Sequence, residues 1–77
     1  MNDHDKFIME SILNCSTFEM LGGEIRAMEL NIFEEYVKSK DPIYEIILAL
    51  INRHSNDEEL GIRIYNIKEK LYNYFNN

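Results

Sequence analysis

The chain has few of the residues that interrupt a helix. It contains one proline and three glycines among 77 residues, and these two residue types are the strongest breakers of regular structure. Alternation of polar and apolar residues, which would indicate β-strands, is absent over any useful length. The sequence therefore predicts an all-α protein.

Cysteine and histidine are also scarce. Cys15 is the only cysteine, so no disulfide can form within one chain. Cys15, His4 and His54 lack the spacing of a metal site, and we expect neither a metal nor another cofactor. A domain this small usually needs stabilisation beyond its core, from disulfides, a bound metal or self-association. Because the first two are not expected here, we expect a homodimer.

Catalytic motifs are missing from the sequence. It has no phosphate-binding loop, no nucleophile elbow and no Glu-x-x-His pair of the kind that helical di-iron proteins use. Cys15 would be reactive at a helix start, where a thiol pKa falls, or inert if it packs between two helices. We expect a protein that is not an enzyme and has no small-molecule substrate.

Long apolar segments are absent too. The longest uninterrupted run is Ile46 to Ile51, far too short to cross a membrane. The first residues are acidic where a secretory signal would be basic. Together with the single cysteine, this pattern predicts a cytoplasmic protein without membrane contact.

Lysine and arginine are outnumbered by aspartate and glutamate, and the excess of acids lies in the first half of the sequence. The net charge is −6, and residues 1–37 hold eight acids against two bases. Direct DNA binding is disfavoured, because it depends on neutralising phosphates. Five acids are expected on the outer side of one helix, either as an acidic docking face or as an ordinary solvated surface: Glu19, Glu24, Glu29, Glu34 and Glu35.

Apolar residues recur at spacings of three and four in two segments. One run is Phe18, Leu21, Ile25, Met28 and Ile32, and the other is Leu60, Ile64, Ile67, Leu71 and Tyr74. Each run forms one stripe along a helix, as helix packing requires. We expect three or four amphipathic helices in an antiparallel bundle. The expected helices lie near residues 4–14, 17–38, 42–54 and 56–75. Residues 1–77 form one domain, in which 1–15 could be a loosely attached helix.

Capping residues set the expected helix starts. Ser16 or Thr17 would cap the second helix, Asp41 before Pro42 the third, and Ser55 the fourth. Gly22-Gly23 falls inside the second helix. This pair is either a hinge or a point of close approach by another helix.

Two helices carry more apolar surface than one small bundle can bury. The additional residues are Phe33, Tyr36 and Val37 near the end of the second helix, and Ile62, Tyr65 and Tyr72 on the last. Such a surface predicts a dimer or partner interface.

The segment Ile46-Ile47-Leu48-Ala49-Leu50-Ile51, followed by a polar break and a terminal helix ending near Tyr74, resembles the enterobacterial YmgB/AriR family of small regulators. Leu21-Gly22 matches a Leu-Gly pair in that family's preceding helix. The interval between these two features is longer here, and Gly23 has no counterpart. The resemblance covers about residues 20–75. It implies a homodimer of antiparallel helices and a connector role in two-component signalling that affects biofilm formation and acid resistance.

These patterns predict a small regulatory protein that acts by contact with a regulatory or signalling protein. The alternative is an acidic phage or mobile-element inhibitor that occupies the nucleic-acid-binding surface of a host protein.

Overall fold

The computed structural model describes residues 3–76, which form six helices and contain no strand. The helices are α1 (Asp3–Asn14), α2 (Phe18–Ala27), α3 (Glu29–Ser39), α4 (Pro42–Arg53), α5 (Asp57–Asn66) and α6 (Lys68–Phe75). The all-α prediction is confirmed, whereas the expected three or four helices were too few.

Two expected helices are each broken once. The segment 17–38 divides at Met28 and the segment 56–75 divides at Ile67. Met28 has φ −92° and ψ 5°, and Ile67 has φ −105° and ψ 15°. At each break the backbone N–H bonds three residues back, Met28 to Ile25 and Ile67 to Ile64. This local tightening redirects the chain without glycine or proline.

The helix starts follow the expected capping chemistry with one exception. Thr17 Oγ1 accepts a hydrogen bond from Met20 N at 3.1 Å, and Asp41 Oδ1 accepts one from Ile43 N at 3.1 Å. Ser55 was the wrong choice for the last cap, because Asn56 Oδ1 accepts from Glu59 N at 3.0 Å. Asn56 is one residue nearer the helix and has an equally suitable side chain.

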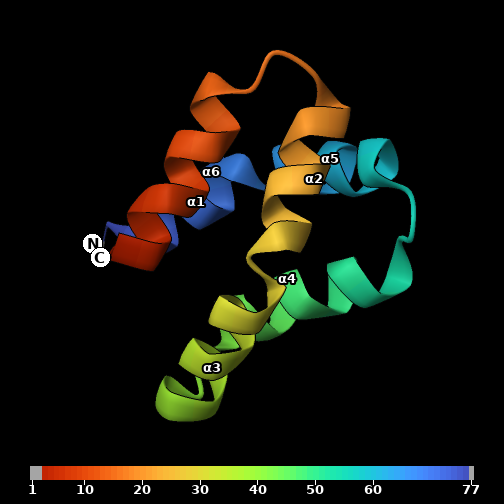
Figure 1. Ribbon diagram of the computed structural model, residues 1–77. Helices are drawn as coiled ribbons and strands as arrows, with labels where there is room; N and C mark the ends of the chain where they lie inside the picture. Colours follow the sequence, from red (N-terminus) through yellow and green to blue (C-terminus); the bar gives the residue numbers. More distant parts are fainter. Residues whose placement is uncertain (1–2, 77) are drawn as a thin grey trace.

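Helices α2 and α5 pack closely against each other through two glycines (Figure 1). A Cβ on Gly22 would lie 1.7 Å from the carbonyl oxygen of Asp57, and a Cβ on Gly61 would lie 1.9 Å from that of Phe18. Of the two interpretations of Gly22, close approach of another helix is the one observed. Gly23 does not share this role, since its Cβ would meet only Asp57 Oδ2 at 3.6 Å.

The two halves of the chain repeat one three-helix arrangement. Helix α1 begins at residue 3 and ends at residue 14, and α4 begins and ends 39 residues later, at 42 and 53. The same offset of 39 residues relates both ends of α2 to those of α5, and the first residue of α3 to the first residue of α6. We call residues 39 positions apart equivalent. Seven equivalent pairs are identical: Ile8/Ile47, Ile12/Ile51, Ser16/Ser55, Glu19/Glu58, Leu21/Leu60, Gly22/Gly61 and Ile25/Ile64.

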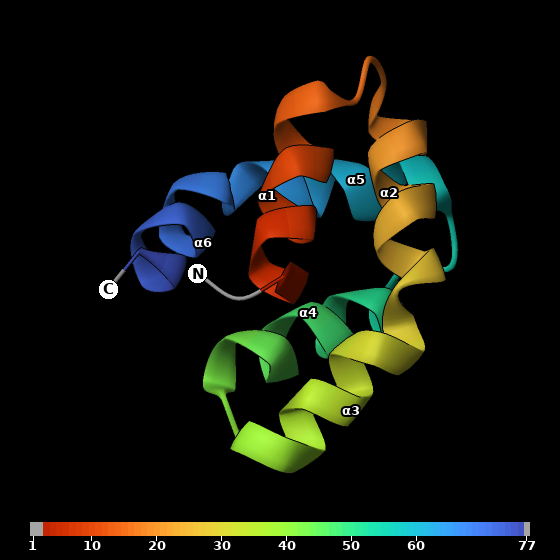
Figure 2. The same cartoon turned by 60° about the vertical axis from the view of Figure 1, so that its left-hand side comes forward.

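Packing between the halves is reciprocal, as in a two-fold symmetric dimer. Gly22 approaches the backbone of Asp57, and Gly61, the equivalent of Gly22, approaches the backbone of Phe18. Phe18 is in turn the equivalent of Asp57. Helix α3 packs on α4, and α6 packs on α1 in the same way (Figures 1 and 2). The hydrogen bond from the Tyr44 hydroxyl to Asp5 joins two equivalent positions across the centre.

Equivalent positions share the core. Ile8, Ile25 and Ile32 are fully buried, and so are their equivalents Ile47, Ile64 and Leu71. Helix α1 contributes Ile8, Met9 and Ile12, with 0%, 6% and 4% exposure, so this helix is part of the packed body. Within residues 3–76 no helix is long and apolar enough to cross a membrane.

Candidate functional site

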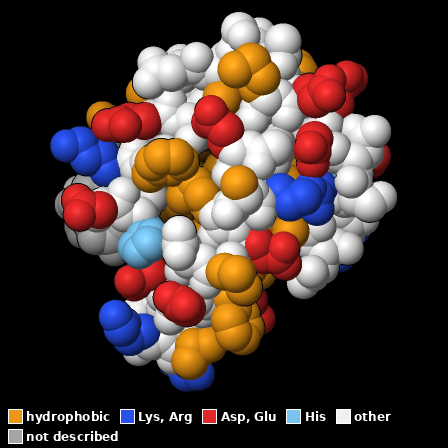
Figure 3. Space-filling view, in the orientation of Figure 1, with side chains coloured by type: hydrophobic (Ala, Val, Ile, Leu, Met, Phe, Trp, Pro, Cys, Tyr) orange, Lys and Arg blue, Asp and Glu red, His pale blue; other side chains and the backbone are white. Residues whose placement is uncertain are grey.

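A groove lies between α3, the last helix of the first half, and α4, the first helix of the second half. Its volume is about 480 Å³, and its lining residues are Glu29, Leu30, Phe33 and Tyr36 from α3 and Glu45, Leu48, Ala49 and Asn52 from α4. Figure 3 shows apolar side chains gathered at this lower end of the molecule, where α3 lies. The floor is apolar, and Glu29 and Glu45 provide the charge.

An exposed apolar stripe runs along α3 beside this groove. Leu30 is 76% exposed, Phe33 52% and Val37 49%, and their spacing of three and four aligns them on one side of the helix. We call these three residues the α3 stripe. Their equivalents are Glu69 and Tyr72 of α6 and Asn76 at its C-cap. The fold therefore accepts polar residues at two of these positions, and packing does not require Leu30 or Val37.

A second groove, between α6 and α1, occupies the equivalent place and also lies between the two halves. Its volume is about 370 Å³, and it is lined by Met9, Ile12, Leu13, Lys68, Glu69, Tyr72 and Asn73. Its charges differ from those of the α3–α4 groove. Glu29 is replaced by Lys68, and Glu45 has Lys6 of α1 as its equivalent. Of these two lysines only Lys68 lines the α1–α6 groove, together with Glu69, whereas Glu29 and Glu45 both line the α3–α4 groove.

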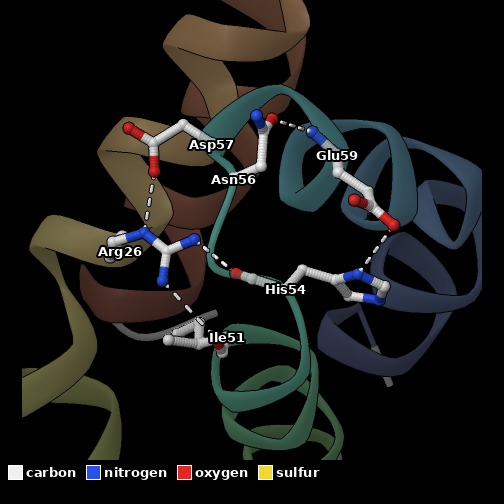
Figure 4. A network of polar contacts seen from close by, with 6 residues as sticks. All are labelled: Arg26, Ile51, His54, Asn56, Asp57 and Glu59. Atoms are coloured by element: carbon white, nitrogen blue, oxygen red, sulfur yellow. Dashed lines mark hydrogen bonds and ion pairs between the residues drawn. The ribbon is translucent and has the colours of Figure 1, made fainter.

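Arg26 anchors α2 to the connection between α4 and α5 (Figure 4). Its Nε lies 2.7 Å from Asp57 Oδ1, and its Nη1 and Nη2 donate to the carbonyl oxygens of Ile51 and His54 at 3.3 and 2.5 Å. Those carbonyls belong to the C-terminal end of α4. A cation there satisfies unpaired acceptors and suits the helix dipole. The role of Arg26 is structural.

An aromatic pair replaces this ion pair in the other half. Phe18, the equivalent of Asp57, packs edge-on against Tyr65, the equivalent of Arg26, with ring centroids 5.5 Å apart. Lys68 Nζ lies 4.0 Å from the centroid of the Tyr65 ring and donates to its hydroxyl at 2.8 Å. Tyr65 therefore has partners within the chain, although it remains 38% exposed.

The six expected interface residues fall in separate places. Phe33, Tyr36 and Val37 lie together on α3 and flank the α3–α4 groove, whereas Tyr72 lines the α1–α6 groove. Ile62 is partly buried on α5. On α3, Phe33 and Val37 are exposed, whereas Tyr36 is partly buried against the core.

The five expected acidic residues are likewise distributed over two helices, because the chain turns at Met28. Glu19 lies beside Arg26 in a polar depression, and Glu24 accepts a hydrogen bond from Cys15 Sγ at 3.3 Å. Glu35 lies 3.6 Å from His4 Nε2, and Glu34 is exposed. Glu29 is the member that borders the apolar groove.

Cys15 packs in the connection between α1 and α2. Partial burial raises the pKa of its thiol, and the hydrogen bond to Glu24 raises it further. The thiol is therefore more fully protonated than a free cysteine, which favours the packed interpretation over the reactive one. His54 Nδ1 lies 3.1 Å from Glu59 Oε1 (Figure 4). Residues 3–76 contain no group of three potential metal ligands.

Sequence reasoning missed Leu30 and the α4 wall of the groove. Leu30 stands three residues before Phe33, so its spacing was a usable signal. Leu48 and Ala49 are apolar residues on a helix with a broad core face, and only the packing of α3 on α4 shows that they border a groove.

Comparison with known proteins gives no family to which this surface can be assigned. Neither a family model, nor a curated protein, nor a solved structure matches the chain.

Proposed function

We propose that this chain is a non-catalytic regulatory protein that acts by binding another protein, and that the α3–α4 groove with the α3 stripe is its docking surface. The observation that carries the proposal is the exposure of Leu30, Phe33 and Val37. Exposed apolar patches of this kind are typical of protein contacts. The polar equivalents of Leu30 and Val37, namely Glu69 and Asn76, support a role outside folding.

The proposed partner is a regulatory or signalling protein, which also agrees with the resemblance to the YmgB/AriR regulators. A second function is favoured by Glu29 and Glu45 at the groove. In that case the chain inhibits a nucleic-acid-binding protein by covering its basic surface. The expected homodimer stays a prediction, and sedimentation equilibrium of the full chain tests it.

Affinity capture with matched variants tests the proposed function. Phe33→Glu disrupts the α3–α4 groove, and Tyr72→Glu makes the same change at the equivalent position of the other groove. The baits are exposed to an extract of the source cells, and bound proteins are identified by mass spectrometry. A partner that the wild type and Tyr72→Glu retain, and that Phe33→Glu loses, is the expected result. One set of proteins shared by all three baits would contradict the proposed surface.

A further inference from the structure

We propose that the occupant of the α3–α4 groove is an amphipathic helix of the partner protein, with an apolar face and basic residues on its flanks. This inference rests on the proposed function and adds the chemistry of the partner. The groove combines an apolar floor with two acids, and no lysine or arginine is among its lining residues. Helix-in-groove recognition uses apolar anchors spaced over successive turns.

The two acids are placed to select a helix by its charge. Helices α3 and α4 are joined by Lys40-Asp41 alone and pack on each other as an antiparallel hairpin. Glu29 stands at the start of α3 and Glu45 in the first turn of α4, so they lie on opposite walls and toward opposite ends of the groove. A helix lying along the groove meets one carboxylate on each flank. The two carboxylates are separated by about 10 Å along the axis of that helix, since each helical residue rises about 1.5 Å.

A second copy of the chain fits this groove less well. In a symmetric dimer the same patch faces itself, so Glu29 and Glu45 of one copy would approach those of the other. The net charge of −6 adds to this repulsion. Like charges brought together across an interface cost affinity, whereas a basic helix gains from both acids.

The equivalent groove provides the internal comparison. The residue equivalent to Glu29 is Lys68 of α6, which lines the second groove, and the residue equivalent to Glu45 is Lys6 of α1, which does not. Lys68 faces Tyr65, and Glu69 stands where the α3 stripe has Leu30. The α1–α6 groove is thus lined by one lysine and one glutamate, whereas the α3–α4 groove is lined by two glutamates and no basic residue. A basic helix therefore meets a net negative charge only in the α3–α4 groove.

The test uses two fluorescent model peptides, each of about four helical turns. Both carry leucine at positions i, i+3, i+4 and i+7; one has lysine on its flanks and the other has glutamate. Binding to the full-length protein is measured by fluorescence anisotropy at low and high salt. We expect the lysine peptide to bind, with an affinity that falls as salt rises, and the glutamate peptide to bind at least tenfold more weakly.

Paired variants locate the binding and its charge dependence. Glu29→Gln/Glu45→Gln should weaken binding of the lysine peptide about tenfold, on the order of 0.7 kcal/mol for each charge pair. Glu10→Gln/Glu69→Gln removes the same net charge outside the groove and should change binding less than twofold. Circular dichroism confirms that all variants fold.

Each contrary outcome overturns the inference. Equal binding of both peptides, or equal losses in both double variants, would show that the groove does not select basic helices. Absence of peptide binding to a monomer would reject a helix of this kind. A dimer that Phe33→Glu dissociates and that excludes the peptide would make a second copy the occupant. The proposed function is judged separately, by whether capture of a natural partner depends on Phe33.

Discussion

Arg26 and Tyr65 occupy equivalent positions, yet they hold α2 and α5 in place by different chemistry. Arg26 pairs with Asp57 and with the carbonyl oxygens at the end of α4, whereas Tyr65 packs on Phe18. The helix bounds correspond in the two halves, whereas the side chains that hold α2 and α5 in place differ. The fold depends on the equivalent positions that hold the same residue in both halves, namely the glycines between α2 and α5 and the buried isoleucines.

The grooves extend this comparison to the surface. Where α3 has Leu30 and Val37, the equivalent residues are Glu69 of α6 and Asn76 at its C-cap, so the fold tolerates polar residues at these two positions. An exposed apolar residue costs solubility. The choice of leucine and valine on α3 therefore indicates a task that α6 does not share. The duplicated arrangement therefore separates the positions that build the fold from those free to serve function.

The largest expected effect is at the helix crossing. Gly22→Ala and Gly61→Ala should each lower the free energy of unfolding by roughly 3 kcal/mol or more, because the added methyl group would meet backbone atoms that cannot turn away. Gly23→Ala is the matched control: its methyl group has room, and alanine favours a helix by up to about 1 kcal/mol. Urea unfolding measures all three. Equal stability of the three variants would contradict the close crossing.

The next effect separates the ion pair from the aromatic pair. Arg26→Ala should cost about 1–2 kcal/mol, because Asp57 and two carbonyl oxygens lose their charged donor, and both partners are partly exposed. Arg26→Lys should recover only part of this loss, since lysine cannot reach three acceptors. The cost of Arg26→Ala should shrink in high salt. The loss of unfolding free energy caused by Tyr65→Ala should not change with salt. If the losses for Arg26→Ala and Tyr65→Ala depended on salt in the same way, the ion pair and the aromatic pair would not differ in chemistry as described.

A smaller effect is expected at the α3 stripe. Phe33→Ser should change the free energy of unfolding by less than about 1 kcal/mol, because the ring is half exposed. The adjacent Ile32→Ala is the control, and its cost should be about 2–4 kcal/mol because Ile32 is fully buried. Thermal and urea unfolding compare the two. Comparable losses would mean that the stripe serves folding after all.

The smallest effect concerns Cys15, whose thiol pKa is raised by partial burial and by Glu24. A raised pKa leaves less thiolate at any given pH, so alkylation by iodoacetamide near pH 8 should be slower in the folded protein than in urea. Glu24→Gln removes the negative charge, should lower the pKa and should speed alkylation. A rate that does not change with Glu24→Gln would show that the contact has no influence on the thiol.

The sequence predicted the helical class, most helix starts and the apolar faces, because these depend on local spacing and capping. It did not predict the breaks at Met28 and Ile67. No glycine or proline marks them, and the apolar spacing of Ile25, Met28 and Ile32 continues through the first without a change of phase. The breaks come from tertiary packing, which directs α3 onto α4 and α6 onto α1.

The candidate site was predicted in part for the same reason. Phe33, Tyr36 and Val37 were identified as surplus apolar residues on one helix, which is a property of spacing. Their relation to Glu45 and Leu48 depends on how α3 folds back on α4, and the sequence pattern carries no signal for that. The acids Glu19 and Glu29 were expected on one helix, and the turn at Met28 places them on two.

The most direct test of the docking surface is a nitrogen–proton NMR titration of the full-length protein with the lysine-flanked peptide. The account predicts that chemical-shift changes concentrate on α3 and α4, at Leu30, Phe33 and Ala49 among others, while the equivalent residues of α6 and α1 stay unchanged. Changes of similar size in both grooves, or changes centred on α1 and α6, would contradict the claim that the α3–α4 groove alone is the binding surface.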